Sequence, residues 1–333
     1  MSDLAANVDA LAADSTFSGV VRVDRAGEPT LERAYGLADR RWEVPNAVDT
    51  RFAIASGVKG MTALVVVTLI EDGTLELETT ARSVLGDDLP LIDDAVTVEQ
   101  LLAHRSGMGD YYDEDLPGEI TDHVLPVPVH ALAETEDYVT VLDGFPTKFA
   151  PGERFSYCNG GYVVLALVAE RASGVSFHDL VARRVCVPAG MADTAFLRSD
   201  ELPARAAVGY LHADGLRTNV LHLPVRGSGD GGIYTTADDV RKLWTSLFAG
   251  QIVTDEWVRE MTRPRSDAPE NQKRYGLGFW LHATSDTVIL EGYDAGVSFY
   301  SLHAPRGDVT ATLISNCSAG PFDVLRFLRE TFG

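Results

Sequence analysis

β-Patterned runs occupy both ends of the chain, and the stretch between them is patterned for helices. Near the amino terminus, "FSGVVRVDRAGEPTLERAYGLAD" alternates apolar and polar residues around a turn, which predicts two strands. Near the carboxyl terminus, turns divide four short runs rich in β-branched and aromatic residues: "YGLGFWLHAT", "DTVILEGY", "GVSFYSLHAP" and "VTATLISN". We therefore expect strands from both ends to share one sheet.

Helical signals fill the middle of the chain and recur at its two ends. Apolar residues follow a helical stripe over residues 57–72, and "GYVVLALVAERASG" predicts a further apolar helix. "TVEQ", which begins at Thr97, has the pattern of a capping box at a helix start. Short amphipathic helices are predicted for the first residues and for "PFDVLRFLRETFG" at the end.

These patterns predict an α+β fold in which helices flank an antiparallel sheet. Residues 1–72 and 228–333 would form a discontinuous α/β domain that contains the sheet, and residues 73–227 a mostly helical domain inserted into it. At 333 residues the chain is long enough for one large domain or two ordinary ones. A cleft between the two parts is the expected ligand site.

A serine and a lysine stand three residues apart where the first long helix begins. Ser56 and Lys59 lie in "FAIASGVKGMTALVVVTLIEDG", and residues with this spacing are neighbours on a helix surface. A serine in the first turn lies beside free backbone N–H groups and the positive end of the helix dipole. A lysine there can take the hydroxyl proton if burial lowers its pKa. The alternative interpretation is the ordinary first turn of a core helix.

A tyrosine and an asparagine in "GERFSYCNGGY" form a second group with chemical potential. Tyr157 and Asn159 are predicted on a loop just before a helix. A tyrosine beside a lysine can exchange protons with a leaving group, and an amide can orient the lysine and bind a carbonyl. The alternative is a turn aromatic followed by an N-cap asparagine. An oxyanion hole would also need a strand that offers a backbone N–H, and "VILEGYDAGVSFYSLHAP" is the segment that fits.

Together these segments resemble the serine β-lactamase and penicillin-binding-protein superfamily, in which S-x-x-K carries the nucleophile. The resemblance is to its class C β-lactamase-like branch, which includes family VIII esterases and D-amino-acid amidases and peptidases. It extends over nearly the whole chain, through "AYGLADRRWEVPNAVDTRFAIASGVKGMTALVVVTLIEDGTLEL", "VTVEQLLAHRSGMGDYY", "FAPGERFSYCNGGYVVLALVAERASG" and "GDGGIYTTADDVRKL".

The resemblance implies roles for the matching residues. Ser56 would be the acylated nucleophile, and Lys59 its general base or the partner of that base. Tyr157 would carry protons to and from the leaving group, and Asn159 would position the substrate and Lys59. The resemblance does not decide which of Lys59 and Tyr157 is the base.

The third motif of that superfamily is where this sequence departs from the pattern. The group shows Lys-Thr-Gly or His-x-Gly, and an ungapped count back from Pro305 places "LEG", residues 290–292, on it. Gly292 is kept, and the N–H of Tyr293 falls on the oxyanion-hole position. Leu290 replaces the cation that helps to hold a substrate carboxylate; a shift by one residue would put Glu291 there. Either way, neutral esters and amides are favoured over substrates that carry a carboxylate.

Other residues are weighed against ordinary structural roles. His104 is interpreted as a structural hydrogen-bonding residue within a helix. Tyr112 is placed on a loop at the rim of the cleft, where it would contact substrate. Trp280 is interpreted as strand core and Cys158 as a small filler. A G-x-S-x-G nucleophile elbow is absent from the sequence.

Composition excludes several classes of partner. The formal net charge of −21 disfavours nucleic acid, whose phosphates require Lys and Arg, and docking on anionic lipid. No apolar run could span a bilayer, and the amino terminus does not resemble a secretory signal. The three cysteines have no paired or zinc-like spacing, so we expect buried, reduced thiols and no metal site. A cytoplasmic location is expected, and the sequence leaves the oligomeric state open.

The sequence therefore predicts a serine hydrolase that forms an acyl-enzyme on Ser56 and acts on small carboxylic esters or amides, without a cofactor. β-Lactamase activity is expected to be weak or absent. The alternatives are a D-amino-acid amidase or peptidase, a β-lactamase, and, from another class, a catalytically poor binding protein on the same scaffold.

Overall fold

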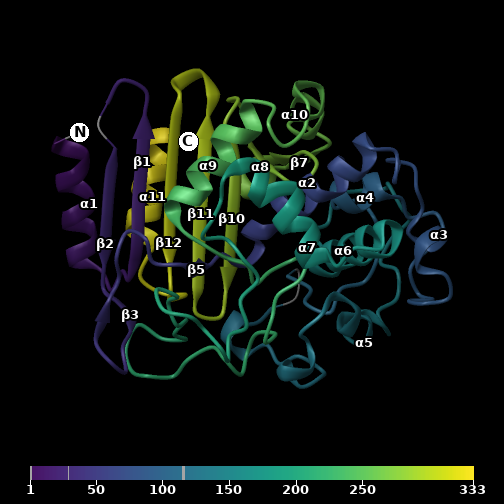
Figure 1. Ribbon diagram of the computed structural model, residues 1–333, viewed down its shortest axis with the longest axis horizontal. Helices are drawn as coiled ribbons and strands as arrows, with labels where there is room; N and C mark the ends of the chain where they lie inside the picture. Colours follow the sequence, from purple (N-terminus) through teal and green to yellow (C-terminus); the bar gives the residue numbers. More distant parts are fainter. Residues whose placement is uncertain (1, 29, 115–116) are drawn as a thin grey trace.

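An eight-stranded antiparallel sheet forms one side of the molecule (Figure 1). The computed structural model describes residues 2–28, 30–114 and 117–333. Across the sheet the strands follow the order β2 (Leu31–Tyr35), β1 (Gly19–Arg25), β12 (Val309–Ser315), β11 (Val297–Ala304), β10 (Val288–Asp294), β9 (Trp280–His282), β8 (Lys273–Tyr275) and β7 (Ser266–Ala268).

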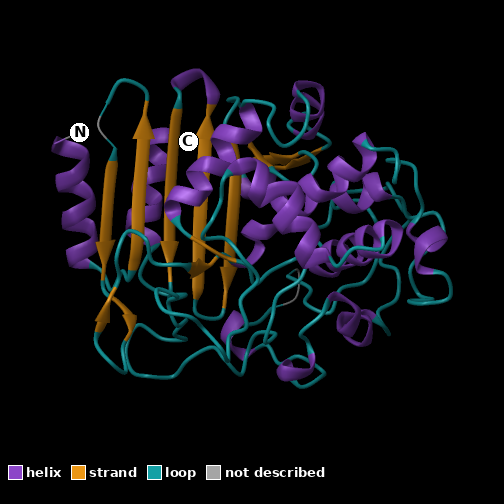
Figure 2. Cartoon of the chain, viewed as in Figure 1, coloured by secondary structure: helices purple, strands orange, loops and turns teal. Residues whose placement is uncertain are grey.

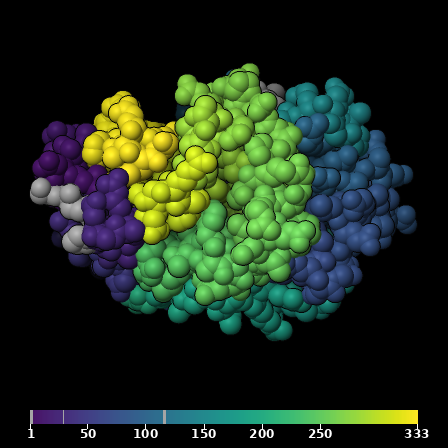
Figure 3. Space-filling view, turned by 90° about the horizontal axis from the view of Figure 1, so that it is seen from above, coloured from purple at the N-terminus to yellow at the C-terminus, as the bar shows by residue number. Residues whose placement is uncertain are grey.

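The two ends of the chain meet in this sheet, as the sequence predicts. Strand β1 pairs with β2 on one side and with β12 on the other. In the space-filling view, the purple amino-terminal residues lie beside the yellow carboxyl-terminal ones (Figure 3). The α+β class with a large antiparallel sheet is thereby confirmed.

Two layers of helices cover the sheet. Helices α1 (Ser2–Asp14) and α11 (Phe322–Phe332) lie on one face, where Val8 and Leu328 join a hydrophobic cluster with Leu302 of the sheet. Helices α2 (Val58–Glu71) and α9 (Ala237–Phe248) pack on the other face. The sheet is thus buried on both sides, which explains why β12 carries no exposed residue.

The remaining helices gather on the side of the sheet where β10 lies, away from β2 (Figure 2). They are short, apart from α6: α3 (Ala81–Leu85), α4 (Val98–Leu102), α5 (Val139–Leu142), α6 (Asn159–Ser173), α7 (Phe177–Val181), α8 (Val187–Ala189) and α10 (Asp255–Met261). Single turns and one π-helical segment complete them: η1 (Ala55–Gly57), η2 (Ile120–Asp122), η3 (Val129–Ala131), η4 (Thr135–Tyr138), η5 (Ala182–Cys186, the π segment), η6 (Pro269–Asn271) and η7 (Pro305–Gly307). Two small two-stranded pairs lie apart from the large sheet: β3 (Leu37–Asp39) with β4 (Val44–Pro45), and β5 (Phe52–Ala53) with β6 (Tyr234–Thr235).

Local sequence signals account for several element boundaries. The capping box is present, since the Thr97 hydroxyl accepts from the Gln100 N–H while the Gln100 side chain accepts from the Thr97 N–H. Helix α6 ends at Gly174, which adopts the left-handed conformation that glycine tolerates. Strands β7 and β8 and the two small pairs were not predicted, because runs of two or three residues are too short to show a period.

One hydrophobic cluster runs from the sheet into the helical region. It contains Phe299 of β11 as well as Leu165 of α6. Because this cluster is shared, it does not mark a boundary between two domains, and the predicted domain boundaries at residues 72 and 227 stay a prediction. All three cysteines are free and buried, as expected. Within the described part of the chain, no helix has both the length and the apolar character needed to cross a bilayer.

Candidate active site

The predicted nucleophile lies on a tight turn between β5 and α2. Ser56 is the middle residue of η1, and Lys59 follows in the first turn of α2. Ala55, just before the serine, has a φ of 44°, a left-handed value that residues with a side chain seldom adopt. The helix thus begins with a 3₁₀ turn rather than the regular α turn expected, and this turn places the Ser56 side chain at a cleft.

The Lys59 ammonium group donates three hydrogen bonds. Its Nζ lies 2.8 Å from Ser56 Oγ, 2.8 Å from Asn159 Oδ1 and 2.9 Å from the backbone oxygen of Asp230. An ammonium has three N–H donors, so all are used. Neutral lysine would keep two N–H groups for Asn159 and Asp230 and direct its lone pair at Ser56. The geometry therefore suits transfer of the Ser56 proton to Lys59.

Burial makes this transfer easier. The Lys59 side chain is only 2% exposed, and loss of water lowers the pKa of its ammonium group. The nearby carboxylates oppose this effect, with Asp230 the strongest, followed by Glu114, but the net shift remains downward. Neutral Lys59 is therefore more accessible than it would be in water.

Tyr157 is held in an aromatic stack beside the lysine. Its ring lies 4.2 Å from that of His104 and 5.8 Å from that of Trp280, with the Trp280 plane inclined by only 9°. Lys59 Nζ is 5.0 Å from the Tyr157 ring centroid. Burial raises the pKa of the Tyr157 phenol well above its usual value, although its hydrogen bond with Ser56 acts in the opposite direction. A neutral phenol suits a proton donor, so the two shifts favour Lys59 as the base.

Asn159 is fixed by partners on both sides. It is the first residue of α6, where the Asp110 carboxylate accepts from the N–H groups of Asn159 (2.5 Å) and Gly160 (2.9 Å). Its Nδ2 donates to Glu114 Oε1 at 3.0 Å and to the backbone oxygen of Tyr112 at 3.2 Å. The Asn159 Oδ1 is therefore directed at Lys59. The expected loop position of Asn159 is wrong, because Asn159 is the first residue of the helix and the Asp110 carboxylate caps that helix.

Strand β10 brings its backbone against the serine turn. A Cβ at Gly292 would lie 2.1 Å from the Ile54 backbone oxygen and 2.9 Å from the Ser56 backbone nitrogen, so only glycine allows this approach. Asp294 of β10 lies opposite Val297 of β11 across a two-residue turn, and the residue pair that closes such a turn is a hydrogen-bonded pair. Because the two kinds of pair alternate along an antiparallel ladder, the next pair, Tyr293 and Ser298, is not hydrogen-bonded. The Tyr293 N–H therefore points away from β11. Strand β9 pairs with β10 only at residues 288 and 289, so no described strand covers that side of Tyr293.

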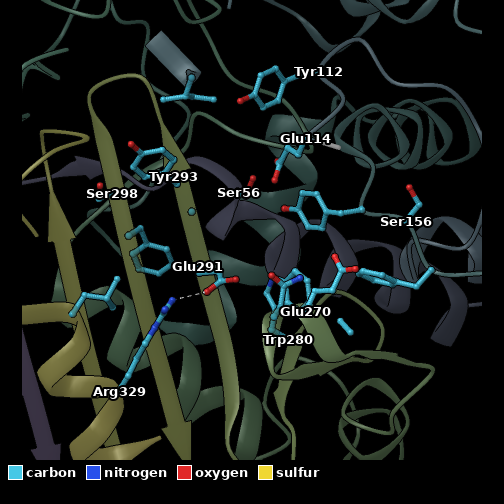
Figure 4. A pocket seen from close by; sticks show the side chains of 18 of the residues that line it. Ser56, Tyr112, Glu114, Ser156, Glu270, Trp280, Glu291, Tyr293, Ser298 and Arg329 are labelled. Carbon is cyan, nitrogen blue, oxygen red and sulfur yellow. Dashed lines mark hydrogen bonds and ion pairs between the residues drawn. The ribbon is translucent and has the colours of Figure 1, made fainter. Parts of the chain in front are cut away.

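A cleft of about 900 Å³ opens in front of Ser56. Figure 4 shows Ser56 between Glu114 on one side and the β10 residues Glu291 and Tyr293 on the other. Tyr157, Tyr112, Tyr293 and Gly292 also line the cleft, so all the predicted site residues except buried Lys59 and Asn159 border it. Tyr112 does so from its loop, with its ring edge against His123 at 4.5 Å. In the described ranges, no group of three or more His, Cys, Asp or Glu is placed to hold a metal ion.

One interpretation from the sequence requires correction. His104 does not lie within a helix: it follows the end of α4 with a φ of 53°, and its Nδ1 accepts from the Cys158 N–H at 3.1 Å. Its structural role stands, because burial lowers its pKa well below the usual value and keeps the ring neutral against Tyr157. The interpretation of Trp280 as strand core is confirmed, since it is buried in the hydrophobic cluster of the sheet, and it also lines the cleft.

Sequence reasoning missed three contributors. Asp230 supplies a backbone acceptor to Lys59, Glu114 binds Asn159, and Lys273 pairs with Glu291 at the edge of the cleft. The signal for Glu114 was its position two residues after Tyr112, which was assigned to the cleft rim. The other two depend on contacts across 171 and 18 residues of sequence, which no local pattern shows.

Leu290 is the residue that the ungapped count places on the cation position of the superfamily's third motif. Its side chain is buried and faces α2, where a Cβ on Gly60 would come within 2.7 Å of Leu290 Cδ2. No charge could occupy this position without replacing that contact. The next residue, Glu291, faces the cleft instead.

Comparison with known proteins agrees with this geometry. The sequence profile of a family described as "Beta-lactamase" matches residues 4–329. Over 328 residues the chain is 29% identical to esterase EstB of Burkholderia gladioli, covering 87% of this chain and 82% of that protein. It is also 29% identical over 270 residues to the D-aminopeptidase of Brucella anthropi, covering 80% of this chain but only 49% of that protein.

A solved structure superposes closely. The penicillin-binding protein from Bacillus halodurans is 34% identical and has a TM-score of 0.90. The alignment covers 98% of this chain and 100% of that one.

The rate of Ser56 acylation should depend on the protonation of Lys59. Because burial lowers the Lys59 pKa from 10.5, its neutral fraction grows as the pH rises through the lowered value, and the rate should fall as the pH drops through it. The acid limb of kcat/KM against pH would report this ionisation, coupled to that of Tyr157. Lys59→Arg should lower kcat/KM on the order of 10²- to 10⁴-fold, because a guanidinium does not deprotonate.

Lys242→Arg is the matched control, since Lys242 forms its ion pairs on α9, away from the cleft. A pH-independent rate over the range in which the chain stays folded, or an active Lys59→Arg variant, would contradict the assignment.

Proposed function

The chain belongs to the beta-lactamase family of serine hydrolases, and from this premise we propose that it hydrolyses small carboxylic esters or amides through an acyl-enzyme on Ser56. The observation that carries the proposal is the 2.8 Å hydrogen bond between Lys59 and Ser56 at the floor of the cleft. A buried lysine with two further acceptors is prepared to receive one proton without moving.

The proposed reaction has two halves. Ser56 Oγ attacks the substrate carbonyl carbon while its proton passes to Lys59, and the backbone N–H groups of Ser56 and Tyr293 hydrogen-bond the oxyanion. The carbon–leaving-group bond then breaks, and the Tyr157 hydroxyl donates its proton to the departing alcohol or amine. Lys59 restores the Tyr157 proton. Water then attacks the acyl carbon while one of its protons passes to Lys59. The bond between that carbon and Ser56 Oγ breaks, and Lys59 returns the proton to Ser56 as the acid leaves.

Esters are the favoured substrates. An alkoxide or phenoxide leaving group needs less help from a proton donor than an amine does, and the pKa of Tyr157 is raised. Leu290 removes the cation that a β-lactam carboxylate would use, and Glu114 and Glu291 line the cleft with negative charge. β-Lactam hydrolysis should therefore be weak or absent.

Hydrolysis of short neutral 4-nitrophenyl esters tests the proposal. Wild type should release nitrophenolate, and Ser56→Ala should lower kcat on the order of 10⁴-fold or more. Ser83→Ala, an exposed serine of α3, is the matched control and should keep the wild-type rate. A Ser56→Ala variant as active as wild type, or a folded wild type without activity on any ester or amide, would instead support a binding protein on this scaffold.

An ammonium-bearing substrate is the second candidate, and Glu114 is the observation that favours it. Its carboxylate, 3.0 Å from Asn159 Nδ2, lines the cleft with Ser56. Asp294, at the end of β10, lines a smaller pocket together with Ser56 and Glu114, and burial raises the pKa of its carboxyl to about 7. A substrate ammonium would offset both charges. Such a group is present in the substrates that the name D-aminopeptidase implies for one relative.

Glu114→Gln distinguishes the two candidates. If Glu114 binds an ammonium, the variant should raise KM for D-alanine 4-nitroanilide about tenfold or more, because a charge-assisted hydrogen bond is lost. The N-acetyl analogue, which has no ammonium, should be unaffected by the substitution. Equal effects on both substrates would assign Glu114 to holding Asn159 alone.

A further inference from the structure

Three charged side chains meet at the edge of the cleft beside β10. Glu291 Oε1 and Oε2 each lie 2.6 Å from Lys273 Nζ, and Glu291 Oε2 lies 3.1 Å from Arg329 Nη2. The residues come from three separate elements: β10, β8 and α11. Figure 4 shows Glu291 and Arg329 in contact on the cleft side of β10.

This cluster stands close to the reacting groups. Glu291 immediately precedes Gly292, the residue packed on the Ser56 turn, and both Glu291 and Ser56 line the cleft. Lys273 Nζ lies 5.1 Å from the ring of Trp280, which stacks on Tyr157. A carboxylate of a substrate bound at Ser56 could therefore reach the two cations if Glu291 did not occupy them.

Burial explains why Lys273 requires a negative partner. Its side chain is 12% exposed, against 25% for Glu291 and 44% for Arg329. A charge this buried is costly unless a counter-charge accompanies it. A carboxylate fits between a lysine and an arginine, and Glu291 supplies that carboxylate from within the chain.

We propose that Glu291 determines specificity by occupying, with its own carboxylate, the site where Lys273 and Arg329 would otherwise bind a carboxylate of the substrate. The inference rests on the proposed ester or amide hydrolysis and defines its substrate class: acyl and leaving groups without a free carboxylate. Leu290 carries no charge, but β8 and α11 supply two cations at the edge of the cleft, and Glu291 neutralises their attraction for an anionic substrate.

The charge around the cleft supports this assignment. Among the residues that the structure describes, the charged side chains that line it are four carboxylates and two guanidinium groups: Glu114, Asp267, Glu270, Glu291, Arg154 and Arg329. With Lys273 included, carboxylates still outnumber cations by one. Loss of the Glu291 charge would balance the two and leave Lys273 and Arg329 without the carboxylate that now binds both.

Glu291→Gln tests the proposal with two pairs of ester probes. One pair places the charge on the acyl side, 4-nitrophenyl butanoate against mono-4-nitrophenyl succinate. The other places it on the leaving group, 4-(methoxycarbonyl)phenyl butanoate against 4-carboxyphenyl butanoate. Wild type should prefer the neutral member of each pair. The preference is measured as kcat/KM for the neutral probe divided by kcat/KM for the anionic probe. In Glu291→Gln this ratio should fall about tenfold or more for at least one pair, because the KM for the anionic probe decreases.

Two further variants separate this role from a general change in charge. Glu270→Gln removes a carboxylate from the same cleft but leaves the Glu291 contacts intact, so its preference should change less than about threefold. Adding Lys273→Met to Glu291→Gln should abolish the gain, since a cation is then missing. Ratios unchanged in Glu291→Gln, or an equal fall in Glu270→Gln, would overturn the proposal.

A second measurement tests the proposal even if the Glu291→Gln variant has no hydrolytic activity. Glu291→Ala opens space for a small anion beside Lys273 and Arg329, and acetate should raise its melting temperature more than that of wild type, with chloride as the salt control. Equal effects of acetate on both proteins would also overturn the proposal. If wild type itself hydrolyses neither probe of either pair, the preference for small esters in the proposed function fails, and the acetate measurement alone then decides the role of Glu291.

Discussion

The site depends on the three hydrogen bonds that the buried Lys59 ammonium group donates. Removing a lysine from water is costly unless each of its donors finds an acceptor. Here the acceptors come from three distant segments: the Ser56 turn, the start of α6 and the glycine-rich turn that contains Asp230. The requirement to satisfy one charge thus fixes the relative positions of the segments that form the site.

Neighbouring contacts serve the same arrangement. Asp110 holds the first turn of α6, and Glu114 orients the Asn159 amide, so the oxygen rather than the nitrogen faces Lys59. The rings of His104 and Trp280 both pack against that of Tyr157. Gly292 allows β10 to pack closely against the serine turn, which brings the strand that carries the proposed oxyanion-binding N–H of Tyr293 beside Ser56. Each contact constrains an atom that the proposed reaction uses.

Sequence reasoning predicted the parts of this structure that have a local signature. Alternating residues gave the strands, and the helical stripe with its S-x-x-K spacing located Ser56 and Lys59 at a helix start. The resemblance of whole segments to a known superfamily added Tyr157 and Asn159. The helix boundary at Asn159 was missed because its capping group, Asp110, is 49 residues away. His104 was placed within a helix because a left-handed residue with a side chain leaves no signal in the sequence.

Specificity was harder to predict than chemistry, for a physical reason. The reacting groups belong to short motifs, whereas the charge of the cleft depends on which side chains converge there. The assignment of Leu290 to the cation position of the superfamily's third motif stays a prediction, and the sequence did not show that Lys273 stands on β8 beside Glu291. That contact depends on the pairing of β8 with β9 and of β9 with β10. The strand pairing therefore determines which charged side chains reach the cleft, although the short motifs alone indicate the proposed reacting groups.

The most direct test of the central claim is the intact mass of the protein after incubation with a fluorophosphonate probe. Ser56, activated by Lys59, should gain one covalent adduct, and Ser56→Ala should gain none under the same conditions. Absence of an adduct on folded wild type, or an adduct that persists in Ser56→Ala, would contradict the account. The Ser56–Lys59 pair would then be a structural feature of the helix start rather than the reactive centre.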